Sequence, residues 1–277
     1  MNGVVTIKQL QFEYRLTASY SADISGHSFT VKFVPKDTSR QKITSLNIAV
    51  KDCEKVYVTT DNFGNQKLYG KISQLHRTFD VRISGIVSTG LDIFEEYTDE
   101  PFSAVLLKAQ TALTKPGVKL SQYHRSLHLE QIDGEYEKAL YIMRSLPKAF
   151  AYCRGATDVH ETAENAFAIG AGVCQDYAHI MTSLLRMEGI PARYVVGMIP
   201  GEGVSHAWVE ALCRGYWYGF DPANNQLVDD GYIKVSCGRD SEDCSVIRGS
   251  FYGCAEQKQA EWITVNELDE IRSQQKE

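Results

Sequence analysis

Three residues in the second half of the sequence could together form a thiol nucleophile with a proton shuttle: Cys174, His206 and Asp221. Cys174 follows a glycine-containing break and begins a predicted helix, where the helix dipole and unpaired backbone N–H groups favour a thiolate over a thiol. A thiolate can attack an amide carbonyl, and a neighbouring histidine can deliver the proton that the departing amine needs. These residue types therefore predict acyl chemistry on amides.

The two partners of the thiol are expected at neighbouring positions in a sheet. His206 lies in an alternating segment, 205–210, and Asp221 ends the next such segment, 217–221. Adjacent antiparallel strands can place the two side by side, so that Asp221 orients the imidazole and stabilises its charged form. Alone, a buried Cys, a strand His or an Asp before Pro is more often structural. It is their order on helix, strand and strand that favours a catalytic triad.

Three further residues, Gly172, Trp208 and Gln175, are candidate contributors to substrate binding. Gly172 leaves space beside the sulfur, and Trp208 shares the strand face of His206, where it either lines the cleft or packs under the imidazole. The backbone N–H of Cys174 is a natural donor to an oxyanion. Side-chain candidates for a second donor are Asn165 and Gln175.

The helix that carries Cys174 is predicted to run to Met187. Its apolar residues recur at spacings of three and four on one face, and Gly189 and Pro191 end it. The opposite side is polar and is expected to be solvated. It consists of Gln175, His179, Thr182 and Arg186, and His179 and Asp176 could alternatively lie in a second layer around the triad.

Short strands with turn residues between them predict an antiparallel β-sandwich over the first part of the chain. The segment Asp61-Asn-Phe-Gly-Asn65 has the composition of a hairpin turn. The predicted strands are 4–14, 28–34, 43–50, 55–60, 67–73 and 77–87, followed by helices at 135–150 and 162–169 and by strands at 192–199, 205–213 and 216–220. Pro147 is expected to break or kink the first helix.

These patterns predict an α+β chain of three parts. Residues 1–100 form the β-sandwich domain, residues 101–150 a helical connector, and residues 151–277 a catalytic core in which a Cys-bearing helix precedes an antiparallel sheet.

Composition and charge narrow the function further. The net charge of the 277 residues is −6 and the Lys and Arg residues are scattered, so no basic face for nucleic acid is predicted. No apolar stretch is long enough to span a bilayer, and the N-terminus lacks the features of a secretory signal. Seven cysteines at irregular spacings favour a reducing compartment. We therefore expect a cytoplasmic protein with mostly buried free thiols, among them Cys53, Cys153 and Cys213.

A metal centre is not predicted, and neither is a cofactor. His160-Glu161 begins like a metalloprotease helix, but position 164 is Glu and the second His of that motif is missing. Cys237, Cys244 and Cys254 are spaced too widely for paired zinc ligands.

The core motifs together resemble a known family. They are Gly172-Val-Cys-Gln-Asp-Tyr-Ala-His179, Gly189-Ile-Pro-Ala-Arg-Tyr194, His206-Ala-Trp-Val-Glu210, Gly219-Phe-Asp-Pro222, and the later Gly238-Arg-Asp240 with Arg248-Gly249. This set resembles the bacterial transglutaminase-like superfamily, in particular its "putative cysteine protease" branch, and the β region ahead of it is similar to the N-terminal sandwich of those proteins. Cys237 within the Gly-Arg-Asp region and Ser241 after it depart from the family pattern.

The resemblance implies a papain-like core with Cys174 as nucleophile, His206 as general base and acid, and Asp221 as the residue that orients it. We expect a thiol-dependent amide acyl hydrolase of the peptidase or amidase type, with a thioester intermediate and a peptide, protein or small amide as substrate. Two alternatives are a protein-glutamine acyl transferase (transglutaminase) and a non-catalytic scaffold that kept the fold.

Overall fold

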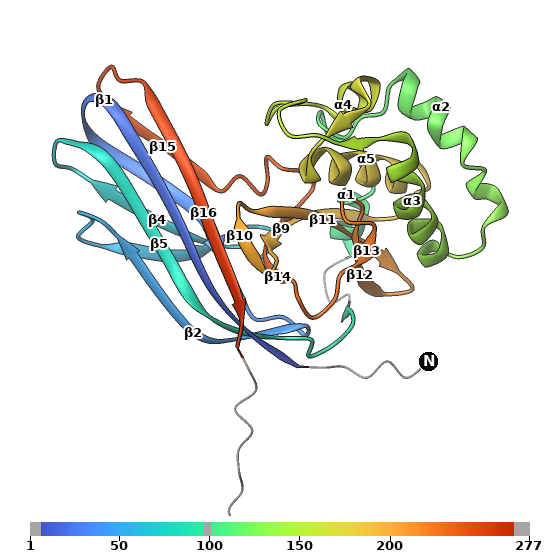
Figure 1. Cartoon of the computed structure of the whole chain (residues 1–277), viewed down its shortest axis with the longest axis horizontal. Helices are drawn as coiled ribbons and strands as arrows, with labels where there is room; N and C mark the ends of the chain where they lie inside the picture. Colours follow the sequence, from blue (N-terminus) through green and yellow to red (C-terminus); the bar gives the residue numbers. More distant parts are fainter. Residues whose placement is uncertain (1–6, 97–100, 269–277) are drawn as a thin grey trace, which may run out of the picture.

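The computed structural model describes residues 7–96 and 101–268 of the chain. Figure 1 shows an elongated β structure at one end and the helices gathered around a second sheet at the other. The predicted class, an N-terminal antiparallel β-sandwich followed by a helix-and-sheet core, is confirmed.

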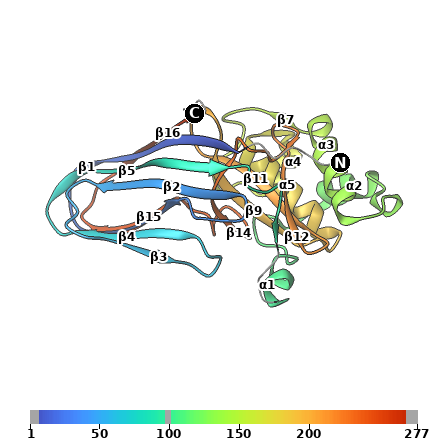
Figure 2. The ribbon, with the colours of Figure 1, turned by 90° about the horizontal axis from the view of Figure 1, so that it is seen from below.

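The first strand, β1 (Lys8–Val34), belongs to both layers of the sandwich. Its first half pairs with β5 and β16, and its second half pairs with β4 and β15. Register shifts between Ser19 and Ile24 and between Ser25 and Ser28 lie where the strand passes from one layer to the other. Figure 2 shows the two layers edge on. Besides β1, they contain β2 (Gln41–Val50), β3 (Val56–Thr60), β4 (Gln66–Ile72), β5 (His76–Thr89), β10 (Gly201–Gly203), β15 (Ile247–Tyr252) and β16 (Gln257–Glu267).

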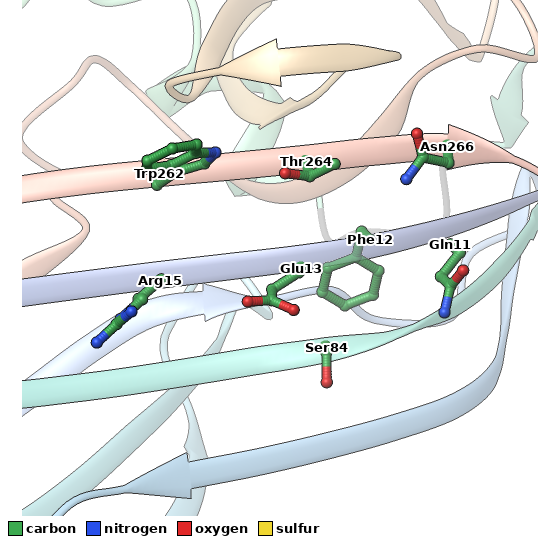
Figure 3. Close-up of a pocket in the computed structure, with 8 residues that line it drawn as sticks. All are labelled: Gln11, Phe12, Glu13, Arg15, Ser84, Trp262, Thr264 and Asn266. Atoms are coloured by element: carbon green, nitrogen blue, oxygen red, sulfur yellow. The ribbon is translucent and has the colours of Figure 1, made fainter.

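The interior of the sandwich follows from the period-two pattern of its strands. Along β1, Leu10, Phe12 and Tyr14 are buried, whereas the residues between them face outward. Figure 3 shows polar side chains of β1, β5 and β16 on that outward face, with Trp262 of β16 at one end of the group. The β3–β4 hairpin forms as predicted, since the Asp61 backbone N–H donates to the Asn65 carbonyl at 3.0 Å.

The second sheet has the strand order β13-β12-β11-β9-β14, with β6 added to β12. Its strands are β6 (Glu95–Glu96), β9 (Ala192–Met198), β11 (His206–Cys213), β12 (Tyr216–Asp221), β13 (Gln226–Leu227) and β14 (Ile233–Gly238). The α-helices are α1 (Pro101–Leu106), α2 (Val118–Ser126), α3 (Glu135–Ala149), α4 (Ala163–Ile169) and α5 (Cys174–Met187). Strands β7 (Ala151–Tyr152) and β8 (Ala171–Gly172) precede and follow α4 in the sequence and form a short parallel pair.

Helix α5 is buried on all sides, which corrects the predicted solvated face. Every residue from Asp176 to Arg186 is buried. One side of α5 packs on β9 and β11, and α3 and α4 pack against it as well. Of the predicted polar side, His179 and Arg186 face protein backbone instead of water.

Three smaller predictions differ from the structure. Pro147 does not break α3, because it lies in the last turn and the helix continues to Ala149. Cys153 is exposed and Cys53 only half-buried, so the prediction of buried thiols is wrong for these two and right for Cys213. Both side chains lie near loop ends, where the chain provides less cover.

The C-terminal strands β15 and β16 return to the sandwich and pair with the two halves of β1. The division of the chain into domains stays a prediction. Strands β15 and β16, which fall within the predicted catalytic core, belong to the sheet that contains β1. Among the described residues, none of the helices is both long and apolar enough to cross a bilayer.

Candidate active site

Cys174 is the first residue of α5 and is half-buried. The turn before it is fixed by Asp176, whose Oδ2 accepts hydrogen bonds from the Val173 backbone N–H and the Thr157 hydroxyl, both at 2.7 Å. A side chain at Gly172 would place its Cβ 2.3 Å from that same oxygen. Gly172 is therefore needed to admit the carboxylate that holds the start of the helix.

His206 and Asp221 lie side by side, as the sequence predicted from their strands. His206 begins β11 and Asp221 ends β12, and the His206 Nε2 is 2.7 Å from the Asp221 Oδ2. Nε2 is thus occupied, and Cys174 lines the same cleft as His206. The structure therefore brings all three predicted residues together.

Asp221 is fully buried and has five hydrogen-bond donors. Besides His206, its Oδ2 accepts from the Tyr232 hydroxyl at 2.7 Å and the Asn224 side-chain amide at 2.8 Å. Its Oδ1 accepts from the backbone N–H groups of Ala223 and Asn224 at 3.0 and 3.1 Å. Burial alone would raise the pKa of Asp221, but these bonds and the charge of His206 outweigh it and lower the pKa below its ordinary value. Asp221 is therefore a fixed negative charge.

The imidazole of His206 is stabilised in its charged form. Burial acts to lower its pKa, but hydrogen bonds with Asp221 and Cys174, together with their charges, raise the pKa to about 9. At neutral pH the imidazole is therefore protonated, with a carboxylate on one side and the sulfur on the other. A charged imidazole beside a sulfur is an arrangement that favours nucleophilic chemistry at that sulfur.

Trp208 packs beside this pair instead of lining the cleft. Its side chain is 1% exposed. Its ring lies 6.3 Å from that of His206 at an interplanar angle of 30°, and 5.3 Å from that of Tyr232 in an edge-on arrangement. Trp208 therefore limits the positions that the imidazole can adopt.

A cleft of about 550 Å³ opens above Cys174 and His206. The residues that line it include Tyr152, Arg154 and Gln175 and those of the loop 199–205. Gln175 reaches the cleft as predicted, but its side-chain amide is already bonded to the Val159 carbonyl at 2.9 Å. Asn165 is exposed on α4 and is not among the residues that line the cleft.

The polar side of α5 meets the Gly-Arg-Asp segment. His179 is fully buried and its Nε2 accepts from the Ser241 backbone N–H at 3.2 Å. Burial lowers the pKa of His179 to about 4, so its imidazole is neutral. Arg186 donates to the carbonyls of Leu107, Ala192 and Arg239, at 2.7–3.0 Å. These side chains hold the helix in its place.

Sequence reasoning missed three residues of the site: Asn224, Tyr232 and Tyr194. Asn224 lies three residues after Asp221 in a turn, and an Asx-type turn after Asp221 was a usable signal for it. Tyr232 immediately precedes β14 with no distinguishing pattern, and Tyr194 lies on β9 within the Gly189–Tyr194 motif, which gave no sign of its place in the cleft. Within residues 7–96 and 101–268, no three His, Cys, Asp or Glu side chains are grouped so that they could hold a metal ion.

Two family models match this chain. The model of the transglutaminase-like superfamily matches residues 125–222, which include Cys174, His206 and Asp221. The model of the bacterial transglutaminase-like N-terminal region matches residues 10–88. Together the two regions make up more than half of the 277 residues.

Similar proteins occur in mycobacteria. An uncharacterized protein of Mycobacterium leprae is 38% identical over 112 residues, which cover 37% of this chain and 40% of that protein. An uncharacterized protein of Mycobacterium tuberculosis is 28% identical over 276 residues, which cover 87% of this chain and 85% of that protein.

A solved structure shares the fold along nearly the whole length. It is that of a "putative cysteine protease" from Cytophaga hutchinsonii, with a TM-score of 0.76 and 22% sequence identity. The superposition covers 95% of this chain and 92% of the other. The β-sandwich and the helix-and-sheet core therefore occur together in both proteins.

Proposed function

Since this chain belongs to the transglutaminase-like superfamily and carries the bacterial N-terminal region ahead of the core, as the resemblance of its motifs predicted, we propose that it is a thiol enzyme that hydrolyses amide bonds. The observation that carries this proposal is that Cys174 shares a cleft with His206, a histidine whose Nε2 is held 2.7 Å from a buried carboxylate. Cys174 is the nucleophile, His206 the proton carrier and Asp221 the residue that orients the imidazole.

The reaction starts from a Cys174 thiolate beside the imidazolium of His206. The Cys174 thiolate attacks the carbonyl carbon of the amide, and the bond from that carbon to nitrogen breaks as the imidazolium of His206 gives its proton to the departing amine. The product is a thioester on Cys174. His206, now neutral, takes a proton from a water molecule that attacks the thioester, and the acid is released with the thiolate restored.

Two donors are available for the oxyanion that forms in each step. One is the backbone N–H of Cys174, because the first N–H groups of a helix have no partner within it. The second is the hydroxyl of Tyr194, which lines the same cleft. Burial raises the pKa of this hydroxyl well above its ordinary value, and the charge of Cys174 adds to the effect. The hydroxyl therefore stays protonated and able to donate.

Water is the acceptor we assign to the thioester. Seven of the 17 residues that line the cleft belong to the loop 199–205, whose residues Glu202 and Val204 are exposed. A site open to solvent gives water ready access, whereas transfer to an amine requires that water be kept out.

An acylation experiment with p-nitrophenyl acetate tests the proposal. We expect a burst of p-nitrophenol and an acetyl group on Cys174, both lost in Cys174→Ala and strongly slowed in His206→Ala. Loss of the acetyl group should proceed at the same rate with or without a primary amine such as cadaverine. Acetylcadaverine formed at a Cys174-dependent rate would assign a transferase instead. A burst that survives in Cys174→Ala would refute the proposal that Cys174 is the nucleophile of a thiol enzyme.

A further inference from the structure

The β-sandwich reaches into the active site through β16 and the loop 199–205. This loop, which lines the cleft, contains β10, and β10 pairs with β16 of the sandwich. Gly201 lies opposite Val265 and Gly203 lies opposite Ile263. Ile263 also lines the cleft. A strand near the C-terminus of the chain therefore supports the part of the cleft next to His206.

A side chain continues this ladder beyond the last backbone pair. Two residues after Gly203, the Ser205 backbone N–H donates to the Glu261 Oε1 at 2.7 Å. Ser205 is bonded directly to His206, the first residue of β11. A carboxylate makes a stronger hydrogen bond with a backbone N–H than a neutral acceptor does. Glu261 therefore fixes the backbone at the point where the loop becomes the catalytic strand.

Apart from the pairing of β10 with β16, the loop has little that would hold it without this bond. Gly201 adopts a φ of +115°, and a Cβ added at Gly201 or Gly203 would meet no atom within 4 Å. Val204 is 62% exposed. Glycines in open space leave a backbone many accessible conformations. The hydrogen bond to Glu261 is the last restraint on the loop before His206.

Glu261 is in turn attached to the interior face of the sandwich through its strand. On β16 it is half-buried and lies opposite Leu16 of β1, a fully buried core residue. The carboxylate therefore joins the packed core of the sandwich to the strand that carries the catalytic imidazole.

We propose that Glu261 is a positioning residue for His206, and that the sandwich is through it a structural part of the active site. This inference rests on the proposed function, because it assigns Glu261 a role in the reactivity of His206. Asp221 orients the imidazole from its side chain, and Glu261 fixes the backbone that carries it. Small displacements of catalytic groups cost large factors in rate.

The test compares Glu261→Ala with two variants of the whole chain. Glu261→Gln keeps an oxygen acceptor for the Ser205 N–H. Glu267→Ala removes a carboxylate from the same strand, where Glu267 pairs only with Lys8 at 3.3 Å. Two quantities are measured in each: the rate of the p-nitrophenyl acetate burst, and the midpoint of the His206 titration by NMR.

We expect Glu261→Ala to slow the burst about five- to tenfold and to lower the His206 midpoint, because the imidazole sits less well against Asp221. Glu261→Gln and Glu267→Ala should stay within about twofold of the wild type. If Glu261→Ala does not fold, Glu261→Met keeps the length of the side chain without an acceptor and takes its place.

Two results would overturn the inference. One is a wild-type burst and midpoint in Glu261→Ala. The other is a loss in Glu261→Gln as large as that in Glu261→Ala, since position would then not be what the carboxylate supplies. A wild-type protein without a Cys174-dependent burst would refute the proposed function instead, and the NMR midpoints would still report on Glu261.

Discussion

The sandwich and the catalytic core place their charges in opposite ways. In the sandwich, ion pairs such as Arg82–Glu13 and Arg77–Asp23 lie on the surface, with all four side chains more than 40% exposed. In the core, Arg186 and Asp221 are buried and each makes several hydrogen bonds.

This difference shows what fixes each region. The alternation of apolar and polar residues is enough to define the sandwich, and its exposed charges are screened by water. The core needs its buried charges to hold a helix terminus and an imidazole in place. Removing one partner of a buried charge leaves the other groups without solvent or protein to satisfy them. Replacing a buried charged residue in the core should therefore cost much more stability than replacing an exposed charged residue in the sandwich.

The largest effect is expected at Asp221. Asp221→Ala removes the carboxylate that orients His206, and we expect a loss of about 10²- to 10⁴-fold in the rate of acylation. The measurement is the p-nitrophenyl acetate burst, with thermal unfolding as a check of the fold. Asp221→Asn, which keeps the shape without the charge, should be impaired as well. A loss of less than about threefold in both would contradict the role of Asp221.

The next effect concerns Arg186. Arg186→Met leaves the carbonyls of Leu107, Ala192 and Arg239 without their donor. We expect a loss of about 3–5 kcal/mol in the free energy of unfolding, measured with urea. A variant within about 1 kcal/mol of the wild type would mean that the buried side of α5 is not what holds the helix.

The pH dependence of stability should be dominated by the core. The pKa of His179 is lowered by burial to about 4, from 6.5 when it is exposed. Its contribution is therefore complete above about pH 6.5 and is lost as the pH falls towards 4. In His179→Gln, the difference in unfolding free energy between pH 7 and pH 4 should shrink by ~3 kcal/mol. An unchanged difference would show that His179 is not buried in its neutral form.

The smallest effect is expected on the surface of the sandwich. Arg82→Met breaks the ion pair with Glu13, which is 42% exposed. We expect a change of less than about 1 kcal/mol in the free energy of unfolding, decreasing further with added salt. A loss comparable with that of Arg186→Met would remove the distinction between the two regions.

Much of the local structure could be predicted from the sequence. Helix α5 begins at Cys174 and ends at Met187 as predicted, because its apolar spacing, the preceding glycines and Gly189 all agree. The strands predicted at 4–14 and 28–34 belong to one long strand, β1 (Lys8–Val34), because the residues between them bend the strand and do not end it. Polarity alone misled at His179 and Arg186, because a polar side chain can face protein backbone as well as water.

What the sequence did not reveal depends on contacts between distant segments. The proximity of Cys174, His206 and Asp221 was predictable from their order and elements. The pairing of β16 with β1 was not, since the two strands lie at opposite ends of the chain. For the same reason Tyr232, which donates to Asp221, and Glu261, which accepts from the Ser205 backbone N–H, are visible only in three dimensions.

The reactivity of Cys174 across pH tests the central claim most directly. In the wild type, iodoacetamide should modify Cys174 before the other thiols near pH 7, with its site read by mass spectrometry. Because the raised pKa of His206 keeps the imidazole charged up to about pH 9, this preference should hold below that pH, and His206→Gln should abolish it. Equal and slow modification of Cys174 and the exposed Cys153 in the wild type would contradict a thiolate held by an imidazolium.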